Sequence, residues 1–179
     1  MKDNLSGGQV MIFLKCIIMC LVFCICFLIG NIISKRYILR VKELKDFKNA
    51  LNIIESKIKF TYEPLPEIFM QTSRLLSENI SKIFINASKY MKDLNCEEAW
   101  NESVKESNTY LNKEDIENIK GFGKMLGKTD KEGQVSHLEL TKTFVEMQIK
   151  KAKDEEEKNA KMYKTLGVIF GLAIVIILI

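Results

Sequence analysis

A phosphate-binding loop is the first chemistry that this sequence suggests, because GFGKMLGKTD at positions 121 to 130 contains a Gly-Lys-Thr triplet. In a Walker-type loop, G-x-x-x-x-G-K-[ST], backbone N–H groups surround the phosphates while the lysine and the hydroxyl reach phosphate and metal. The spacing fails here. The residue five positions before Gly127 is Phe122, and the two other glycines flank it at 121 and 123. We therefore expect no nucleotide site, and a cryptic nucleotide-binding enzyme is only an alternative.

The other residues with catalytic potential form no known arrangement. The chain has one histidine, His137, and a lone histidine on a helix is more often a surface or core residue than a general base. Neither G-x-S-x-G nor H-E-x-x-H occurs, and the cysteines show no zinc-type spacing. The sequence gives no reason to place Asp115, Glu117 and Asp130 around a substrate pocket. We expect no enzyme activity, no cofactor and no metal ion.

The Gly-Lys-Thr stretch fits a corner between two helices better. Apolar residues recur at helical spacing from Ile116 to Leu126, and Gly127 follows as a helix C′ residue. Thr129 and Glu132 then match a T-x-x-E capping box at the start of the next helix. Gly121 and Gly123 each cost a helix about 1 kcal/mol relative to alanine, which a close helix crossing would explain.

We interpret this corner as structural first and as a candidate partner-interaction site second. Its candidate residues are Gly127, Thr129, Asp130 and Gln134, with Asp115 expected nearby. Asp130 would strengthen the helix N-terminus, and Gln134 would bond across to the preceding helix.

Both ends of the chain are apolar enough to enter a membrane. Residues 16–33 contain no charge, and residues 11–14 extend this run past Lys15 to the roughly 20 residues that span a bilayer core. No small-residue cleavage site follows, so we expect a retained anchor rather than a cleaved signal peptide.

The C-terminal run is shorter. Residues 166–179 rise only about 21 Å as a helix, against a hydrocarbon core of about 30 Å. Gly167 and Gly171 form a G-x-x-x-G face that allows close packing on another helix. The alternative is a hydrophobic tail that lies in the membrane interface or in the core of a bundle.

Four of the five cysteines lie in the first apolar segment. Cys16, Cys20 and Cys24 share one helix face at a spacing of four residues. Acylation or a helix contact would use this stripe, but we favour simple packing of small apolar side chains.

The basic residues predict the orientation in the membrane. Cations follow the first apolar segment from Lys35 to Lys48 and precede the second from Lys150 to Lys164, whereas only Lys2 and Asp3 lie at the outer end of the first segment. The positive-inside rule therefore puts residues 34–165 in the cytoplasm and both termini outside. The net charge of +4 is mild, so these lysines are expected to face anionic lipid and not nucleic acid.

Helical periodicity runs through the segment between the apolar ends. Apolar residues at spacings of three and four start at Val41, and Pro64 and Pro66 are expected to end that helix. Asn95 and Asn112 are expected N-caps of later helices, and the last helix is expected to run unbroken from about residue 130 into the membrane.

We predict an all-α fold, with a small cytoplasmic helical bundle between an N-terminal and a C-terminal transmembrane helix. The expected domains are a leader and membrane anchor at 1–33, the bundle at 34–165 and a short C-terminal membrane segment at 166–179.

The chain resembles the stage III sporulation protein AB family in several stretches. These are A-L-x-x-x-E-x-x-I at 50–58, EPLPEIF at 63–69, EEAW at 97–100, residues 113–134 and the tail from Tyr163. The most specific part is L-G-x-[ST]-D-x-x-x-Q, which is formed here by Leu126, Gly127, Thr129, Asp130 and Gln134.

The resemblance implies a structural role in the channel that joins mother cell and forespore during endospore formation. It also implies similarity to the platform proteins of type II secretion and type IV pilus machines, which offer a cytoplasmic helical surface to a motor ATPase. The implied partners are the stage III sporulation protein AA ATPase, other membrane proteins of the same channel and the lipid bilayer on the mother-cell side. A homo-oligomer is compatible with this role. The remaining alternative is a membrane-anchored helical scaffold unrelated to sporulation.

Overall fold

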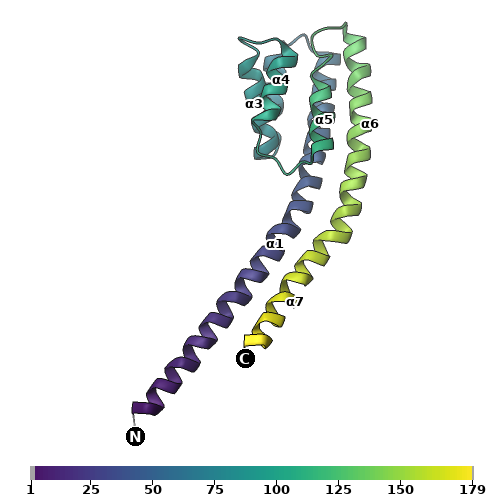
Figure 1. Ribbon diagram of the computed structural model, residues 1–179. Helices are drawn as coiled ribbons and strands as arrows, with labels where there is room; N and C mark the ends of the chain where they lie inside the picture. The colour runs from purple at the N-terminus through teal and green to yellow at the C-terminus, as the bar shows by residue number, and fades with distance from the viewer. Residues whose placement is uncertain (1–2, 179) are drawn as a thin grey trace. The chain divides into compact units, whose positions relative to one another are not determined.

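The computed structural model describes residues 3–178, with side-chain environments from 11 to 177. All regular structure in this part of the chain is helical, which confirms the all-α prediction. Lys2, which the orientation prediction uses, and Ile179, the last residue of the predicted C-terminal segment, lie outside the described residues. The elements, drawn in Figure 1, are α1 (Asp3–Phe60), α2 (Leu65–Ser73), α3 (Glu78–Tyr90), α4 (Cys96–Lys105), α5 (Lys113–Phe122), α6 (Lys131–Glu155), the π-helical turn η1 (Glu156–Ala160) and α7 (Lys161–Leu178).

The chain forms two compact units. One unit is the bundle, Leu39–Asp154, and the other pairs the residues up to Ile38 with those from Glu155 onward. We call the second unit the helix pair.

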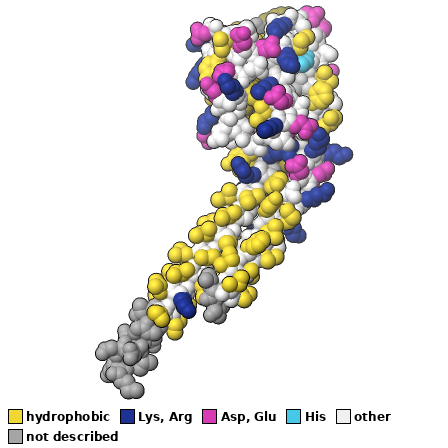
Figure 2. All heavy atoms as spheres, in the orientation of Figure 1, with side chains coloured by type: hydrophobic (Ala, Val, Ile, Leu, Met, Phe, Trp, Pro, Cys, Tyr) yellow, Lys and Arg dark blue, Asp and Glu magenta, His cyan; other side chains and the backbone are white. Residues whose placement is uncertain are grey.

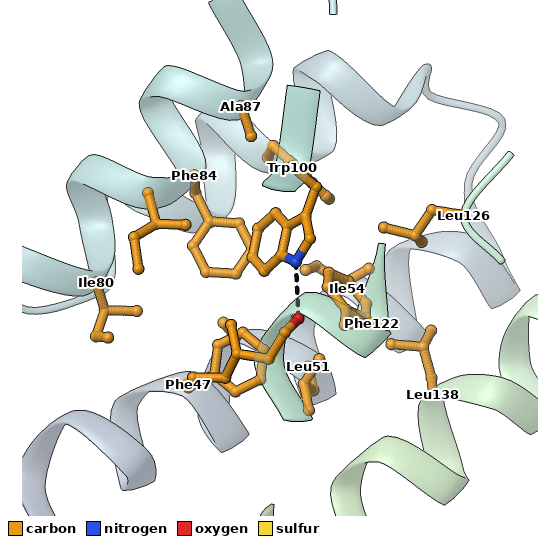
Figure 3. Packing of buried hydrophobic residues seen from close by; sticks show 14 of the residues in the cluster. Phe47, Leu51, Ile54, Ile80, Phe84, Ala87, Trp100, Phe122, Leu126 and Leu138 are labelled. Atoms are coloured by element: carbon orange, nitrogen blue, oxygen red, sulfur yellow. Dashed lines mark hydrogen bonds between the residues drawn. The ribbon is translucent and has the colours of Figure 1, made fainter. Parts of the chain in front are cut away.

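The core of the bundle is an aromatic cluster that draws on five helices. Figure 3 shows the indole of Trp100 among apolar side chains, with its Nε1 donating a hydrogen bond of 2.7 Å to the carbonyl oxygen of Ile119. Trp100 lies 4.9 Å from Phe122 and 5.1 Å from Phe84, measured between ring centroids. Buried rings in such tilted and edge-on arrangements attract one another beyond the effect of their burial. The cluster is completed by Phe47 of α1 and Phe69 of α2.

Local sequence signals set most helix ends. The α1 helix ends at Phe60, and Pro64 is the N-cap residue of α2. Asn95 accepts a hydrogen bond of 2.9 Å from the backbone N–H of Glu98 at the start of α4. Asn112 and Asp115 form a capping box at the start of α5. The end of α1 before the two prolines and the helix starts at Asn95 and Asn112 agree with the sequence expectation, because each depends on residues close to the boundary.

The two glycines of α5 have different roles. A Cβ at Gly123 would lie 2.5 Å from the ring of Trp100, so the close helix contact predicted there exists. A Cβ at Gly121 would meet no atom within 4 Å, so no crossing helix explains this second glycine. The carbonyl oxygen of Gly121 instead lies 3.2 Å from Nε2 of His137.

The sequence suggested that the last helix is a single unbroken α-helix. The structure instead has a π-helical turn, η1, between α6 and α7. The buried positions of α6 include Gln148 and Ala152, and an unbroken period of 3.6 residues would bring about positions 159, 163, 166 and 170 to the same face. The buried positions after η1 are instead Ala160, Gly167 and Gly171. The π-helical turn therefore shifts the buried face by one residue.

Candidate functional site

The candidate residues at positions 115 to 134 do not form one site. Asp115 lies in the first turn of α5, whereas Gly127 to Gln134 follow the other end of that helix. Because a helix rises 1.5 Å per residue, about 10 Å separates Asp115 from Phe122 alone. The expectation that Asp115 lies near the corner is wrong.

Asp115 is instead part of a buried ion pair with α1. Its Oδ2 accepts from Nε of Arg40 at 2.7 Å, and its Oδ1 accepts from Nη2 of Arg40 at 3.2 Å. The same Oδ2 accepts from the backbone N–H of Asn112 at 2.9 Å. The two side chains are 7% and 0% exposed. This two-bond geometry fixes α1 against the start of α5.

Glu43 extends this polar network along α1. It is 3% exposed and accepts from Nδ2 of Asn79 at 2.6 Å and from the backbone N–H of Tyr110 at 2.7 Å. Burial raises the pKa of Glu43, and these two hydrogen bonds act in the opposite direction. Glu43 therefore joins α1 to α3 and to the segment before α5.

Sequence reasoning missed both α1 residues of this network. Arg40 counts in the sequence as one of the cations that set membrane orientation. The available signal is that Arg40 and Glu43 lie beside Val41 and Leu44, within the apolar stripe of α1. Charged residues on the buried face of a helix need hydrogen-bond or ion-pair partners, but the sequence alone does not show which residues those partners are.

The corner before α6 has the expected glycine but a different cap. Gly127 has a φ of 73°, the left-handed conformation that favours glycine, although turns separate it from the end of α5 at Phe122. The cap of α6 is Asp130, whose Oδ1 accepts from the backbone N–H of Gly133 at 3.0 Å. The box predicted from Thr129 and Glu132 is wrong by one residue, because α6 begins at Lys131.

Thr129 and Gln134 also differ from their expected roles. Oγ1 of Thr129 is buried without a hydrogen-bond partner among the described residues. The side-chain amide of Gln134 donates to the carbonyl oxygen of Thr129 at 3.0 Å, so it closes the corner on itself and does not reach α5.

A hollow of about 310 Å³ opens beside this corner, between the end of α1, the start of α2 and the start of α6. Tyr62 at its edge is 99% exposed, and Phe60 nearby is 81% exposed. Nζ of Lys131 lies 5.2 Å from the centre of the Tyr62 ring. We call this hollow with Phe60 the distal pocket; its lining residues include Ile58, Tyr62, Leu65, Gly127, Lys131 and Gln134.

The GFGKMLGKTD stretch has the geometry of a packed connection. The Cα of Gly123 lies against the indole of Trp100, and Lys128 pairs with Glu97 of α4. The ring of His137 lies within hydrogen-bond distance of the carbonyl oxygen of Gly121. In α4, burial raises the pKa of the Cys96 thiol to about 11. In the described part of the chain, no group of three or more His, Cys, Asp or Glu side chains could hold a metal ion.

The helix pair brings Gly167 and Gly171 against α1, at a place that includes a third glycine. A Cβ at Gly167 would lie 2.9 Å from the carbonyl oxygen of Cys26 and 3.1 Å from Cα of Gly30. A Cβ at Gly171 would lie 2.8 Å from the ring of Phe23. Small residues let two backbones approach closely in this way in a membrane.

The surface of the helix pair is apolar. Two helical stretches are long and apolar enough to cross a membrane, and their most apolar windows are 0% and 11% buried, so neither is the core helix of a soluble domain. Figure 2 shows hydrophobic side chains over the helix pair and charged side chains over the bundle. Cys16, Cys20 and Cys24 are exposed, and Cys26 is partly buried. The three-cysteine stripe does not pack against α7.

Comparison with known proteins assigns the family. The sequence profile described as "Stage III sporulation protein AB" matches residues 15–179. The chain belongs to the stage III sporulation protein AB family. Stage III sporulation protein AB of Bacillus subtilis (strain 168) is 29% identical over 149 residues, which cover 81% of this chain and 87% of that protein. A solved structure of stage III sporulation protein AB matches with a TM-score of 0.62 at 25% identity, covering 67% of this chain and 98% of the solved chain.

Family membership makes this chain a sporulation protein. The exposed apolar surface of its helix pair indicates that it associates with a membrane.

Proposed function

We propose that this protein is a non-enzymatic membrane platform of the channel between mother cell and forespore, and that its bundle binds a cytoplasmic ATPase. The proposal rests on family membership, on the apolar surface of the helix pair, and on the structural contacts that already engage the residues with catalytic potential. Asp115 is held by Arg40, and His137 lies against a backbone carbonyl. The buried Asp115 therefore serves as one half of a structural ion pair, and the half-buried His137 is engaged with the backbone.

The bundle is proposed to lie in the cytoplasm, with both chain ends outside. Lys35 and Arg36 after the first apolar run are exposed, as are Lys158, Lys161 and Lys164 before the second. Such cations next to membrane segments favour the cytoplasmic side. Asn108 is exposed on the bundle and offers a probe for this orientation. In a cysteine-free background, Asn108→Cys should resist a membrane-impermeant maleimide until the cells are opened.

The distal pocket is the surface that we propose for the ATPase. Tyr62 carries this assignment, because it is 99% exposed beside a hollow with an apolar floor. Exposed aromatic residues next to pockets are frequent anchors of protein interfaces. Phe60, the last residue of α1, is 81% exposed beside Tyr62, so both aromatic side chains are accessible to a partner.

The partner that we propose is the stage III sporulation protein AA ATPase. The full-length chain in lipid nanodiscs would be titrated with the purified ATPase, and nucleotide binding would be measured on the same chain without the ATPase. Tyr62→Ala and Phe60→Ala should each weaken binding at least tenfold. Leu75→Ala is the matched control, because Leu75 is 69% exposed and lies in the turn between α2 and α3. Equal loss in the control, or saturable ATP binding by the chain alone, would contradict the platform role.

Other membrane proteins of the same channel are proposed as lateral neighbours of the helix pair. The alternative of a scaffold unrelated to sporulation conflicts with family membership. A deletion strain that still forms heat-resistant spores at the normal frequency would support that alternative.

A further inference from the structure

A groove runs along one side of the helix pair, where α1 and α7 touch through glycines. Gly30 and Gly167 form its floor, and an added Cβ at Gly167 would lie 3.1 Å from Cα of Gly30. Because neither floor residue has a side chain, the larger residues beside them stand as walls around a hollow of about 240 Å³. All of these residues belong to one compact unit. We call the hollow the lateral groove; its other lining residues are Cys26, Ile29 and Ile33 of α1 and Tyr163, Leu166 and Phe170 of α7.

The lateral groove is apolar and opens to the surface of the helix pair. Ile29 and Phe170 in its walls are 53% and 60% exposed. In a membrane this surface faces lipid, and an unfilled groove would leave its walls without the dispersion contacts of a close-packed environment. An acyl chain matches the groove in shape and chemistry. Apolar contact alone gives no selectivity, however, because the surrounding lipid tails are as apolar as the groove.

A cation lies beyond the end of the groove that carries Ile33. Arg36 follows Ile29 and Ile33 by seven and three residues, so it lies on the same face of α1, about 4.5 Å beyond Ile33. Helical side chains lean toward the N-terminus of their helix, which directs the stem of Arg36 over the mouth of the groove. Arg36 is exposed and has no ion-pair partner among the described residues. Since arginine binds phosphate through two parallel hydrogen bonds, Arg36 can hold the phosphate of a lipid whose chain lies in the groove.

The charged residues at this end of the helix pair leave a positive excess. The exposed cations there are Lys35, Arg36, Lys158, Lys161 and Lys164. The acidic residues of the same part are Glu155 and Glu156, which are half-buried, and Glu157, which is exposed. Glu155 already has an interaction partner. The cations therefore outnumber the carboxylates, which favours a lipid with an anionic headgroup over a zwitterionic one.

We propose that the lateral groove binds one anionic glycerophospholipid, with an acyl chain between Ile29 and Phe170 and the phosphate on Arg36. This site differs from a general attraction of the cations to anionic lipid, because it requires Arg36 in particular. Lys35 is adjacent and also exposed, but it faces about 100° away around α1. The site does not depend on the ATPase proposal, since all of its residues belong to the helix pair and none lies in the distal pocket.

Photocrosslinking of the full-length chain tests the position of the acyl chain. Nanodiscs of phosphatidylcholine would contain a minor fraction of phosphatidylglycerol with a diazirine in the middle of one acyl chain, and mass spectrometry would map the adducts. Adducts at Ile29 should be about five times more frequent than at Leu28, which is 55% exposed but lies about 100° farther around α1 from α7. Unlabelled phosphatidylglycerol should compete for Ile29, whereas additional phosphatidylcholine should not. Equal labelling of Ile29 and Leu28, or equal competition by the two lipids, would overturn the proposal.

Variants at two pairs of adjacent exposed positions separate this site from general effects. Arg36→Gln should weaken the competition by phosphatidylglycerol about tenfold, through loss of charge-assisted hydrogen bonds to the phosphate. Lys35→Gln removes the same charge and should leave the competition almost unchanged. Ile29→Trp should fill the groove and remove the adducts at Phe170, whereas Leu28→Trp should keep them. Equal effects of Arg36→Gln and Lys35→Gln, or full labelling of Phe170 in Ile29→Trp, would overturn the proposal.

Discussion

Arg40 and Asp115 lie 75 positions apart in the sequence and form a two-bond ion pair that is almost completely buried. This pair joins α1, which continues to the membrane segment, to the first turn of α5. Removal of the Asp115 carboxylate takes both of these hydrogen bonds from the buried Arg40 guanidinium, and breaking a buried ion pair in this way typically costs about 3 to 5 kcal/mol.

Asp115→Asn should therefore reduce the free energy of unfolding by about 3 kcal/mol or more. Urea denaturation of the full chain in detergent, followed by Trp100 fluorescence, measures this. Glu117→Gln is the matched control, since Glu117 is exposed on the same helix and should change stability by less than about 0.5 kcal/mol. A small and equal effect of both substitutions would show that the ion pair contributes little.

The pH dependence of stability should include a contribution from Glu43. Burial raises the pKa of Glu43 in the folded protein above its usual value of 4.5. The folded state therefore holds this proton more tightly, and the corresponding stability is present below pH 4.5 and is lost as the pH rises through the raised pKa. Glu43→Gln removes this titration.

The unfolding free energies of the original chain and of Glu43→Gln, measured from pH 4 to pH 7, provide the test. The value for the original chain minus that for the variant should fall as the pH rises. Glu78→Gln provides a control of opposite sign, because Lys82 lowers the pKa of the exposed Glu78 carboxylate. A constant difference for Glu43 across this range would contradict the prediction.

The cap of α6 predicts unequal effects for two adjacent residues. Asp130→Ala should cost about 1 kcal/mol, because Asp130 accepts from the backbone N–H of Gly133. Thr129→Val should be neutral or stabilising, because the buried Oγ1 of Thr129 has no described partner. Thermal unfolding of both variants distinguishes this structure from the capping box expected at Thr129, which requires the reverse order. Normal folding of Asp130→Ala with lost ATPase binding would add a functional role to its structural one.

The close backbone contact in the helix pair predicts a strong effect at Gly30. Gly30→Val should separate α1 from α7, since even a Cβ at this position would lie 2.7 Å from the carbonyl oxygen of Tyr163. Spin labels on cysteines placed at Ile32 and Ile169, both exposed, would report the separation in nanodiscs. Ala173→Val on the exposed face of α7 is the control and should leave the distance unchanged.

The π-helical turn predicts that the packing of α7 on α1 depends more on the number of residues between Glu156 and Ala160 than on their identity. Deletion of the exposed Lys158 would remove the extra residue and rotate the face of α7 by about 100° relative to α6. Gly167 and Gly171 would then leave α1, and the spin-label distance should increase as in Gly30→Val. Lys158→Ala keeps the length and should preserve the pair. An unchanged distance in the deletion variant would mean that the turn does not set the register.

The sequence by itself determined the helical class, the apolar ends, the end of α1 before Pro64, and the helix starts at Asn95 and Asn112. These features depend on residues within one helical turn or on composition, so tertiary contacts were not needed to predict them. Tertiary structure decided which partners the buried charges of Arg40 and Glu43 have, because both pairings join segments far apart in the chain. It also moved the α6 cap from Thr129 to Asp130 and brought Gly30 against Gly167. In these cases several local choices differ by only about 1 kcal/mol, so packing of the whole helix selects among them.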